Sequence, residues 1–88
     1  MNANAPTKVR TTIAAVRAFN DLSGIGLVQS KRNVDALVKA FNEDQDLTWC
    51  LTLPLEGRDR ATGGVKLVLM ADLIALVRAN VKPVTEVL

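Results

Sequence analysis

The sequence contains no histidine and no tyrosine, and only one of its 88 residues is a cysteine. Histidine is the commonest general base, a usual zinc ligand and the base that activates serine or cysteine nucleophiles. The single Cys50 excludes an internal disulfide, and its apolar neighbours predict a buried, unreactive thiol in a reducing compartment. These absences weaken an enzymatic interpretation, so we expect no catalytic residue, no metal site and no cofactor.

Long hydrophobic runs are also absent. The most apolar stretch, residues 65–81, is interrupted by Lys66, Asp72 and Arg78, so it is not suited to cross a membrane. The first ten residues lack the apolar segment of a signal peptide. The sequence therefore predicts a soluble, cytoplasmic protein with no membrane partner.

Aromatic side chains are few, so the core must be built from aliphatic residues. Hydrophobic residues make up 49% of the chain and charged residues 23%, a balance typical of a folded domain. A chain of this length forms one small domain that buries only about 60–65% of its unfolded surface. Oligomerisation would therefore add stability.

Apolar residues recur every three to four positions in two segments, which predicts two helices. The first is expected from Thr7, as its cap, to Ser23 and Gly24. An apolar connector follows over residues 24–29, with room for one short strand. The second helix is expected to begin at Ser30, as its cap, and to end before the acidic turn at residues 43–46.

Two strands and a third helix are predicted in the second half of the chain. Residues 47–53 alternate between apolar and small polar side chains, the pattern of a half-buried strand that Pro54 ends. A loop over 55–64 leads to a second strand at 65–69, paired with the first as a hairpin. Residues 70–80 predict a helix that is apolar around most of its circumference and therefore central or covered by a partner.

The pattern indicates a single α+β domain in the order α-α-β-β-α, with helices packed on one face of a two- or three-stranded antiparallel sheet. Residues 1–6 are expected to form a disordered lead, 7–82 the domain, and 83–88 a tail or edge strand. The predicted core comprises Val9, Ile13, Val16, Phe19, Val34, Leu37, Phe41, Trp49, Leu51, Leu67, Leu73, Ile74 and Val77.

Charges in the predicted second helix oppose its dipole. Lys31 and Arg32 fall in its first turn, and Glu43 and Asp44 follow its last turn. Each misplaced charge costs about 0.3–1 kcal/mol at low salt, which indicates that another molecule binds each end. In a homodimer with antiparallel second helices, these cations would meet the acids of the other copy, while Leu76 and its neighbours on the third helix would supply apolar contact. The alternative is that all four charges simply face water.

The segment over residues 57–64 combines three glycines with Arg58 and Arg60. Glycine-rich loops can bind phosphate through converging N–H groups, but the lysine-serine ending of a P-loop is missing. The pattern favours a flexible hairpin loop kept soluble by alternating charges. Its two arginines remain candidates for contact with a partner protein or a phosphate.

The sequence favours a non-enzymatic interaction protein that regulates or inhibits a partner protein by surface contact, as a homo-oligomer. The expected contact residues are Lys31, Arg32, Arg58 and Arg60, and the expected self-association residues are Lys31, Arg32, Glu43, Asp44 and Leu76. The alternative is a small DNA- or RNA-binding regulator that uses the start of the second helix and the 57–64 loop. A uniformly basic surface would favour this alternative. The charge is instead uneven, because the first 42 residues carry six cations and two acids, and the rest five cations and seven acids.

Overall fold

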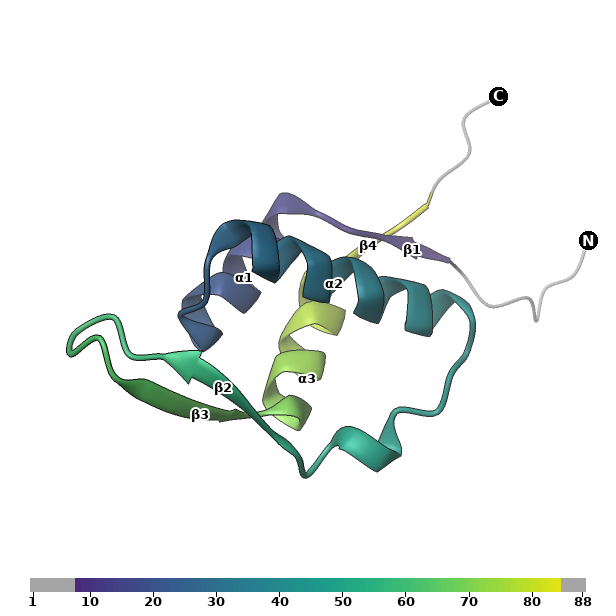
Figure 1. The fold of residues 1–88 in the computed structure, drawn as a ribbon. Coiled ribbons are helices and arrows are strands. Elements are labelled where there is room, and N and C mark those ends of the chain that lie inside the picture. Colours follow the sequence, from purple (N-terminus) through teal and green to yellow (C-terminus); the bar gives the residue numbers. More distant parts are fainter. Residues whose placement is uncertain (1–7, 85–88) are drawn as a thin grey trace, which may run out of the picture.

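A computed structural model describes residues 8–84, which form an α+β fold with three helices and two small antiparallel sheets (Figure 1). The expected α+β class and the predicted order of the main elements are confirmed. The elements are β1 (Val9–Arg10), α1 (Ile13–Ser23), α2 (Leu27–Asn42), the 3₁₀ helix η1 (Thr48–Cys50), β2 (Pro54–Arg58), β3 (Val65–Leu69), α3 (Met70–Asn80) and β4 (Lys82–Pro83). The predicted disordered lead at 1–6 and the last four residues of the predicted tail lie outside the described residues.

The first and last strands form a short ribbon, so the chain is extended where the sequence predicted the start of a helix. β1 pairs antiparallel with β4, and the Val84 N–H donates to the Lys8 carbonyl at 2.8 Å. On the neighbouring helix, the Asn42 side chain accepts from the Val9 N–H at 2.8 Å and donates to the Val9 carbonyl at 2.9 Å. These bonds hold β1 extended, and α1 begins only after Thr12, whose hydroxyl accepts the Ala15 N–H.

The turn between α1 and α2 is shorter than the sequence predicted. Gly24 caps α1 in the left-handed conformation, with φ of 73°, and α2 begins at Leu27, three residues after it. Neither the possible strand in the connector nor the cap at Ser30 is correct. Ser30 is fully buried inside α2, and its N–H donates to the Gly26 carbonyl at 2.9 Å.

The predicted strand over residues 47–53 is wrong, because a local turn replaces it. Asp46 Oδ1 accepts hydrogen bonds from both the N–H and the hydroxyl of Thr48, at 2.9 and 2.7 Å. This Asx-type turn leads into η1, where the Cys50 N–H donates to the Leu47 carbonyl at 3.2 Å. Pro54 begins β2 instead of ending a strand, a position where its missing N–H is tolerated.

β3 and α3 have the predicted bounds, 65–69 and 70–80. β3 pairs antiparallel with β2, and Pro54 lies opposite Leu69 at one end of the hairpin while Arg58 lies opposite Val65 at the other. The connecting loop therefore spans only residues 59–64, not 55–64. Asp59 closes it, because its N–H donates to the Gly64 carbonyl and its own carbonyl accepts the Gly63 N–H.

The core is arranged around α3, which packs against α1 and β3 (Figure 1). Six residues of the predicted core are buried: Phe19, Val34, Leu37, Leu73, Ile74 and Val77. Val9, Val16, Phe41 and Leu51 are partly buried beside them. The core predictions for Ile13, Trp49 and Leu67 are wrong, because these side chains are 75%, 71% and 65% exposed.

Two backbones cross closely where the hairpin meets the end of α1. A Cβ atom added to Gly57 would overlap the carbonyl oxygen of Ser23, and one added to Gly24 would overlap the carbonyl oxygen of Arg58. Glycine at both positions lets β2 lie directly on the C-terminal turn of α1. This crossing fixes where the hairpin projects from the helices.

Candidate interaction surface

A groove lies between α1 and the first half of α2. It consists of two adjoining hollows of about 500 and 490 Å³, which share Val16, Leu27 and Lys31 in their walls. The remaining wall residues are Thr11, Thr12, Ile13, Arg17, Val28, Arg32 and Asp35. We call this surface the α1–α2 groove.

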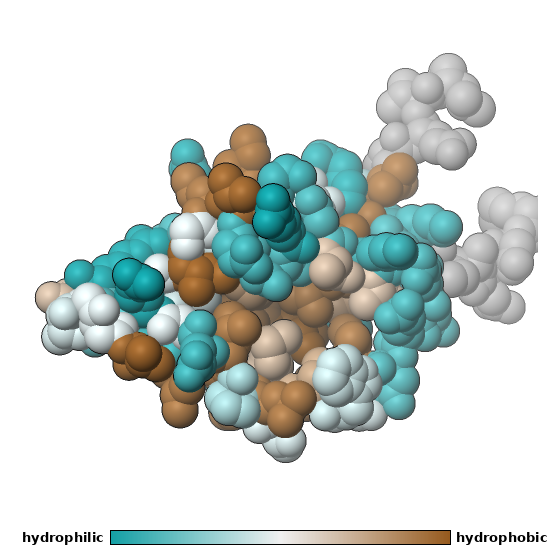
Figure 2. Space-filling view, viewed as in Figure 1, coloured by the Kyte–Doolittle hydropathy of each residue, from teal (hydrophilic) through white to brown (hydrophobic). Residues whose placement is uncertain are grey.

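Large apolar side chains are exposed in this groove. Ile13 is 75% exposed in the first turn of α1, and Leu27 and Val28, at the start of α2, are 59% and 70% exposed. Figure 2 shows apolar residues gathered at the top of the view, over α1 and the first turns of α2. Single exposed apolar residues are ordinary, whereas adjoining ones mark interaction sites.

Positive charge surrounds these apolar residues. Lys31 Nζ lies 2.7 Å from Asp35 Oδ2, and the Thr11 hydroxyl donates to Asp35 Oδ1 at 2.6 Å. The hydrogen bond from Lys31, and then that from Thr11, lowers the pKa of Asp35 below its ordinary value of 3.8. Within residues 8–84, Arg17 and Arg32 form no ion pair. The acid in the groove is therefore already bonded, and the two arginines are available to a partner.

The structure divides the four predicted contact residues between two places. Lys31 and Arg32 line the α1–α2 groove, whereas Arg58 ends β2 and Arg60 lies in the hairpin loop. Because α2 begins at Leu27, Lys31 and Arg32 lie in its second turn and not at its N-terminus. This position weakens the predicted conflict between these cations and the helix dipole, which acts mainly on the first and last turns. Lys39 lies in the last turn of α2, where a cation interacts favourably with the dipole.

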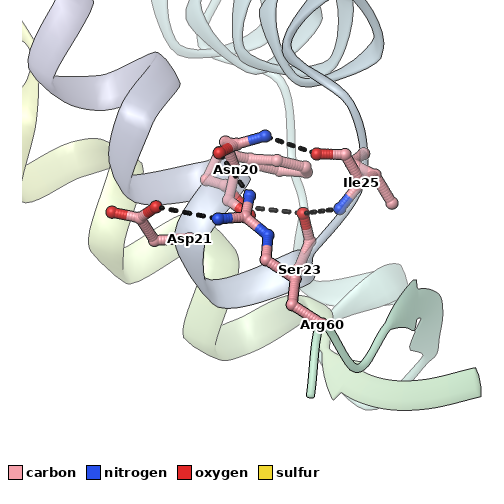
Figure 3. A network of polar contacts seen from close by, with 6 residues as sticks. Asn20, Asp21, Ser23, Ile25 and Arg60 are labelled. Carbon is pink, nitrogen blue, oxygen red and sulfur yellow. Dashed lines mark hydrogen bonds and ion pairs between the residues drawn. The ribbon is translucent and has the colours of Figure 1, made fainter. Parts of the chain in front are cut away.

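Arg60 is bonded within the chain, in a network that joins the hairpin loop to the end of α1 (Figure 3). Its guanidinium donates to the Asn20 carbonyl at 3.0 Å and to the Asn20 side-chain oxygen, and it lies 3.6 Å from Asp21. The Asn20 amide in turn donates to the Ile25 carbonyl across the α1–α2 turn. Arg60 therefore orients the loop, whereas Arg58 is exposed on the hairpin.

The predicted self-association residues lie far apart in one chain. Glu43 caps α2 at its C-terminal end, and the exposed Asp44 follows in the left-handed conformation, with φ of 54°. Arg32 and Glu43 are 11 positions apart along α2, which is about 17 Å at about 1.5 Å per residue. Leu76 is half-buried on α3.

Of the ten wall residues of the groove, sequence reasoning identified only Lys31 and Arg32; the residues that it missed include Ile13, Arg17, Leu27 and Val28. It assigned Ile13 to the core and Leu27 and Val28 to a connector. Helical periodicity shows that a residue is apolar, but it cannot show which face another helix covers. The adjacent pair Leu27-Val28 in front of two cations was the available signal.

A separate hollow, of about 440 Å³, lies outside the α1–α2 groove, between α2 and the segment that includes η1. The exposed Trp49 and Leu53 line it together with Ala36 and Ala40 of α2, and Figure 2 shows the depression at the centre of the view. Cys50 also lines this hollow, but its side chain is buried and its thiol donates to the Leu47 carbonyl. This hollow has no charged lining residue.

Comparisons with protein-family models, with curated proteins and with solved structures found no match. In the part of the chain that the structure describes, no helix is long and apolar enough to cross a membrane. Across the same 77 positions, 8–84, no group of three or more histidine, cysteine, aspartate or glutamate residues is placed to hold a metal ion.

Proposed function

We propose that this protein is a non-enzymatic binding module that regulates or inhibits a partner protein by surface contact, and that the partner docks in the α1–α2 groove. One observation supports the proposal above the others: Ile13, Leu27 and Val28 are exposed side by side, and cations border them. A contiguous apolar surface with a charged rim is the usual anatomy of a protein interface.

The charges define the kind of partner. Arg17 and Arg32 are available while Asp35 is already bonded to Lys31 and Thr11, so the groove favours a segment with carboxylates beside apolar side chains. An amphipathic acidic helix has this composition and would lie along the groove with its apolar face inward. The module would act by covering that segment and excluding its other contacts.

Apolar burial would supply most of the affinity. Each large aliphatic side chain that the groove covers contributes about 1.5–3 kcal/mol, whereas an exposed ion pair contributes about 0–1 kcal/mol. The arginines would therefore select the partner and raise the association rate more than they would tighten the complex. This division predicts that salt slows binding without abolishing it.

The direct test uses two fluorescent amphipathic helical peptides with identical apolar residues, one with glutamates and one with lysines on its polar face. We expect the acidic peptide to bind more tightly than the basic one, and Arg32→Glu to weaken its binding several-fold. Lys39→Glu is the matched control, because Lys39 is exposed on the same helix but lies outside the groove. Equal affinity for both peptides, or equal loss in both variants, would contradict the proposal.

The natural partner can be sought with the same two variants as baits in an affinity pull-down from the native host. A genuine groove partner should be recovered by the wild type and by Lys39→Glu, and in clearly smaller amount by Arg32→Glu. A protein that all three baits recover to the same extent binds elsewhere on the molecule.

The nucleic-acid alternative stays a prediction and is tested in parallel. Polarisation titrations with labelled duplex and single-stranded oligonucleotides, at low and moderate salt, should show steeply salt-dependent binding if it holds. Because Arg60 is bonded to Asn20, loss of binding in Arg58→Glu would then be more informative than loss in Arg60→Glu. No binding at low salt would exclude the alternative.

A further inference from the structure

The hairpin has one covered face and one open face. Alternation along β2 and β3 places Leu55, Gly57 and Val68 towards the helices, and both Gly57 and Val68 are buried. The other face consists of Pro54, Glu56, Arg58, Val65, Leu67 and Leu69, all exposed. We call these six residues the outer hairpin face.

The outer hairpin face is strongly apolar along β3. Val65 is 73% exposed, Leu67 65% and Leu69 49%, and the three side chains follow one another on one strand. Figure 2 shows apolar residues along the hairpin at the lower left of the view. Adjoining exposed apolar side chains of this kind mark an interaction surface.

Two opposite charges lie beside this apolar row. Glu56 is opposite Leu67, and Arg58 is opposite Val65, two residues further along β2. Neighbouring residues on one face of a strand are about 7 Å apart, and within residues 8–84 neither Glu56 nor Arg58 forms an ion pair. If a second copy is rotated by 180° and placed against this face, its cation meets the acid of the first copy and its acid meets the cation of the first copy.

We propose that the outer hairpin face is a homodimer interface, in which a second copy stacks its own outer hairpin face across a twofold axis. The axis runs across the two strands at the level of Gly57 and Lys66, which are opposite each other in the register. Glu56 then faces Arg58 of the second copy, and Arg58 faces Glu56 of the second copy. Leu67 faces Val65 of the second copy, and Val65 faces Leu67 of the second copy, so the apolar residues beside the two charges also meet each other.

The charges explain why a second copy fits this face better than the acidic partner of the α1–α2 groove. Glu56 would repel an acidic segment, whereas the groove presents two free arginines and an acid that is already bonded. The two surfaces share no residue, so the dimer and the groove partner are independent proposals. The arrangement also differs from antiparallel pairing of α2, which would join Lys31 to Glu43.

The size of the face sets the expected strength. Stable complexes bury about 800 Å² per partner, and a five-residue hairpin is about 17 Å long and two strands wide. The outer hairpin face alone is smaller than that standard. We therefore expect a dimer that dissociates in the micromolar range.

Sedimentation velocity over a concentration series, on the full chain, tests the dimer directly. Wild type should shift from monomer to dimer between low and high micromolar concentrations. Leu67→Lys should remain monomeric, with an unchanged circular dichroism spectrum because Leu67 is largely exposed. Ile13→Lys is the matched control, since Ile13 is also a largely exposed apolar residue but lies in the α1–α2 groove, and this variant should still dimerise.

A charge swap tests whether Glu56 faces Arg58 of the second copy, without removing any apolar contact. Glu56→Arg alone and Arg58→Glu alone should each raise the dissociation constant at least several-fold, and the double variant should restore it. This arm remains decisive if Leu67→Lys fails to fold. A wild type that stays monomeric at high micromolar concentration overturns the proposal. So does a dimer that survives Leu67→Lys, or one that is lost in Lys31→Glu and recovered with Glu43→Lys.

Discussion

Replacing Gly57 by alanine tests the close crossing between β2 and the end of α1. The added methyl group would overlap the carbonyl oxygen of Ser23. The atoms that the methyl group would meet all belong to the backbone of Ser23, and the position of a Cβ is fixed by its own backbone, so no side chain can rotate away to relieve the overlap. The strand must move away from α1 by a distance on the order of an ångström, and this displacement would also strain the bonds of Arg60 to Asn20.

The cost follows from ordinary overpacking. An extra methyl group in a well-packed core destabilises by about 1–3 kcal/mol when neighbouring side chains can adjust. Because the backbone must adjust here, we expect about 3 kcal/mol or more for Gly57→Ala. For a domain of this size, each kcal/mol lowers Tm by about 4–8 °C, so Tm should fall by roughly 12–24 °C.

Two other glycines of the hairpin loop provide a graded control, measured by urea and thermal unfolding followed by circular dichroism. Gly63 has a φ of 75° and open space around it, so Gly63→Ala should cost about 1–2 kcal/mol from backbone conformation alone. Gly64 has neither a positive φ nor a backbone overlap, and Gly64→Ala should change stability by less than about 0.5 kcal/mol. If Gly57→Ala is no less stable than Gly64→Ala, the backbones do not cross as described.

Two further predictions concern the contacts of α2. Asp35→Asn should make the free energy of unfolding depend less on acid pH. The pKa of Asp35 is lowered in the folded state, so its ionised form stabilises the fold above pH about 4, and this stabilisation is lost as the pH falls through the folded-state pKa. A constant gap between the two proteins in urea titrations from about pH 7 to pH 3 would contradict this. Asn42→Ala removes both side-chain bonds to Val9 and should cost about 1–3 kcal/mol, with faster hydrogen exchange at Val9. Asn33→Ala, whose exposed amide bonds only within α2, should show neither effect.

Long periodic patterns predicted the elements that tertiary contacts reinforce. Residues 70–80 are apolar on nearly every side, and they form the central helix with the predicted bounds. β3 was equally well defined by its alternation. Helix starts were less predictable, because Thr7 and Ser30 were predicted as caps whereas the N-cap positions are Thr12 and Gly26. Bonds from distant residues decide between them, such as those of Asn42 to Val9.

The error at residues 47–53 has a local cause. Perfect alternation favours a strand only if another strand is available for pairing, and β3 pairs instead with residues 54–58. Asp46 meanwhile offers Thr48 two short-range hydrogen bonds, which start η1. A short-range bond of this kind competes directly with extended structure.

The sequence predicted the charged residues of the candidate surfaces but not their apolar ones. Lys31 and Arg32 were singled out by their charge, and the structure places both in the α1–α2 groove. The apolar residues beside them could not be distinguished from core residues, because exposure depends on which faces the three helices leave uncovered. Arg60 illustrates the opposite case, since its charge suggested a partner contact while its bonds lie within the chain.

The β1–β4 ribbon has a practical consequence for handling the protein. Because the Val84 N–H is bonded to the Lys8 carbonyl, Lys8 and Val84 lie side by side, on the side of the fold away from the hairpin (Figure 1). Dyes attached at these two positions would thus report on one location and leave the outer hairpin face clear. A short Gly/Ser linker from residue 84 to residue 8, with new termini opened in the 59–64 loop, should give a circular permutant that keeps the ribbon.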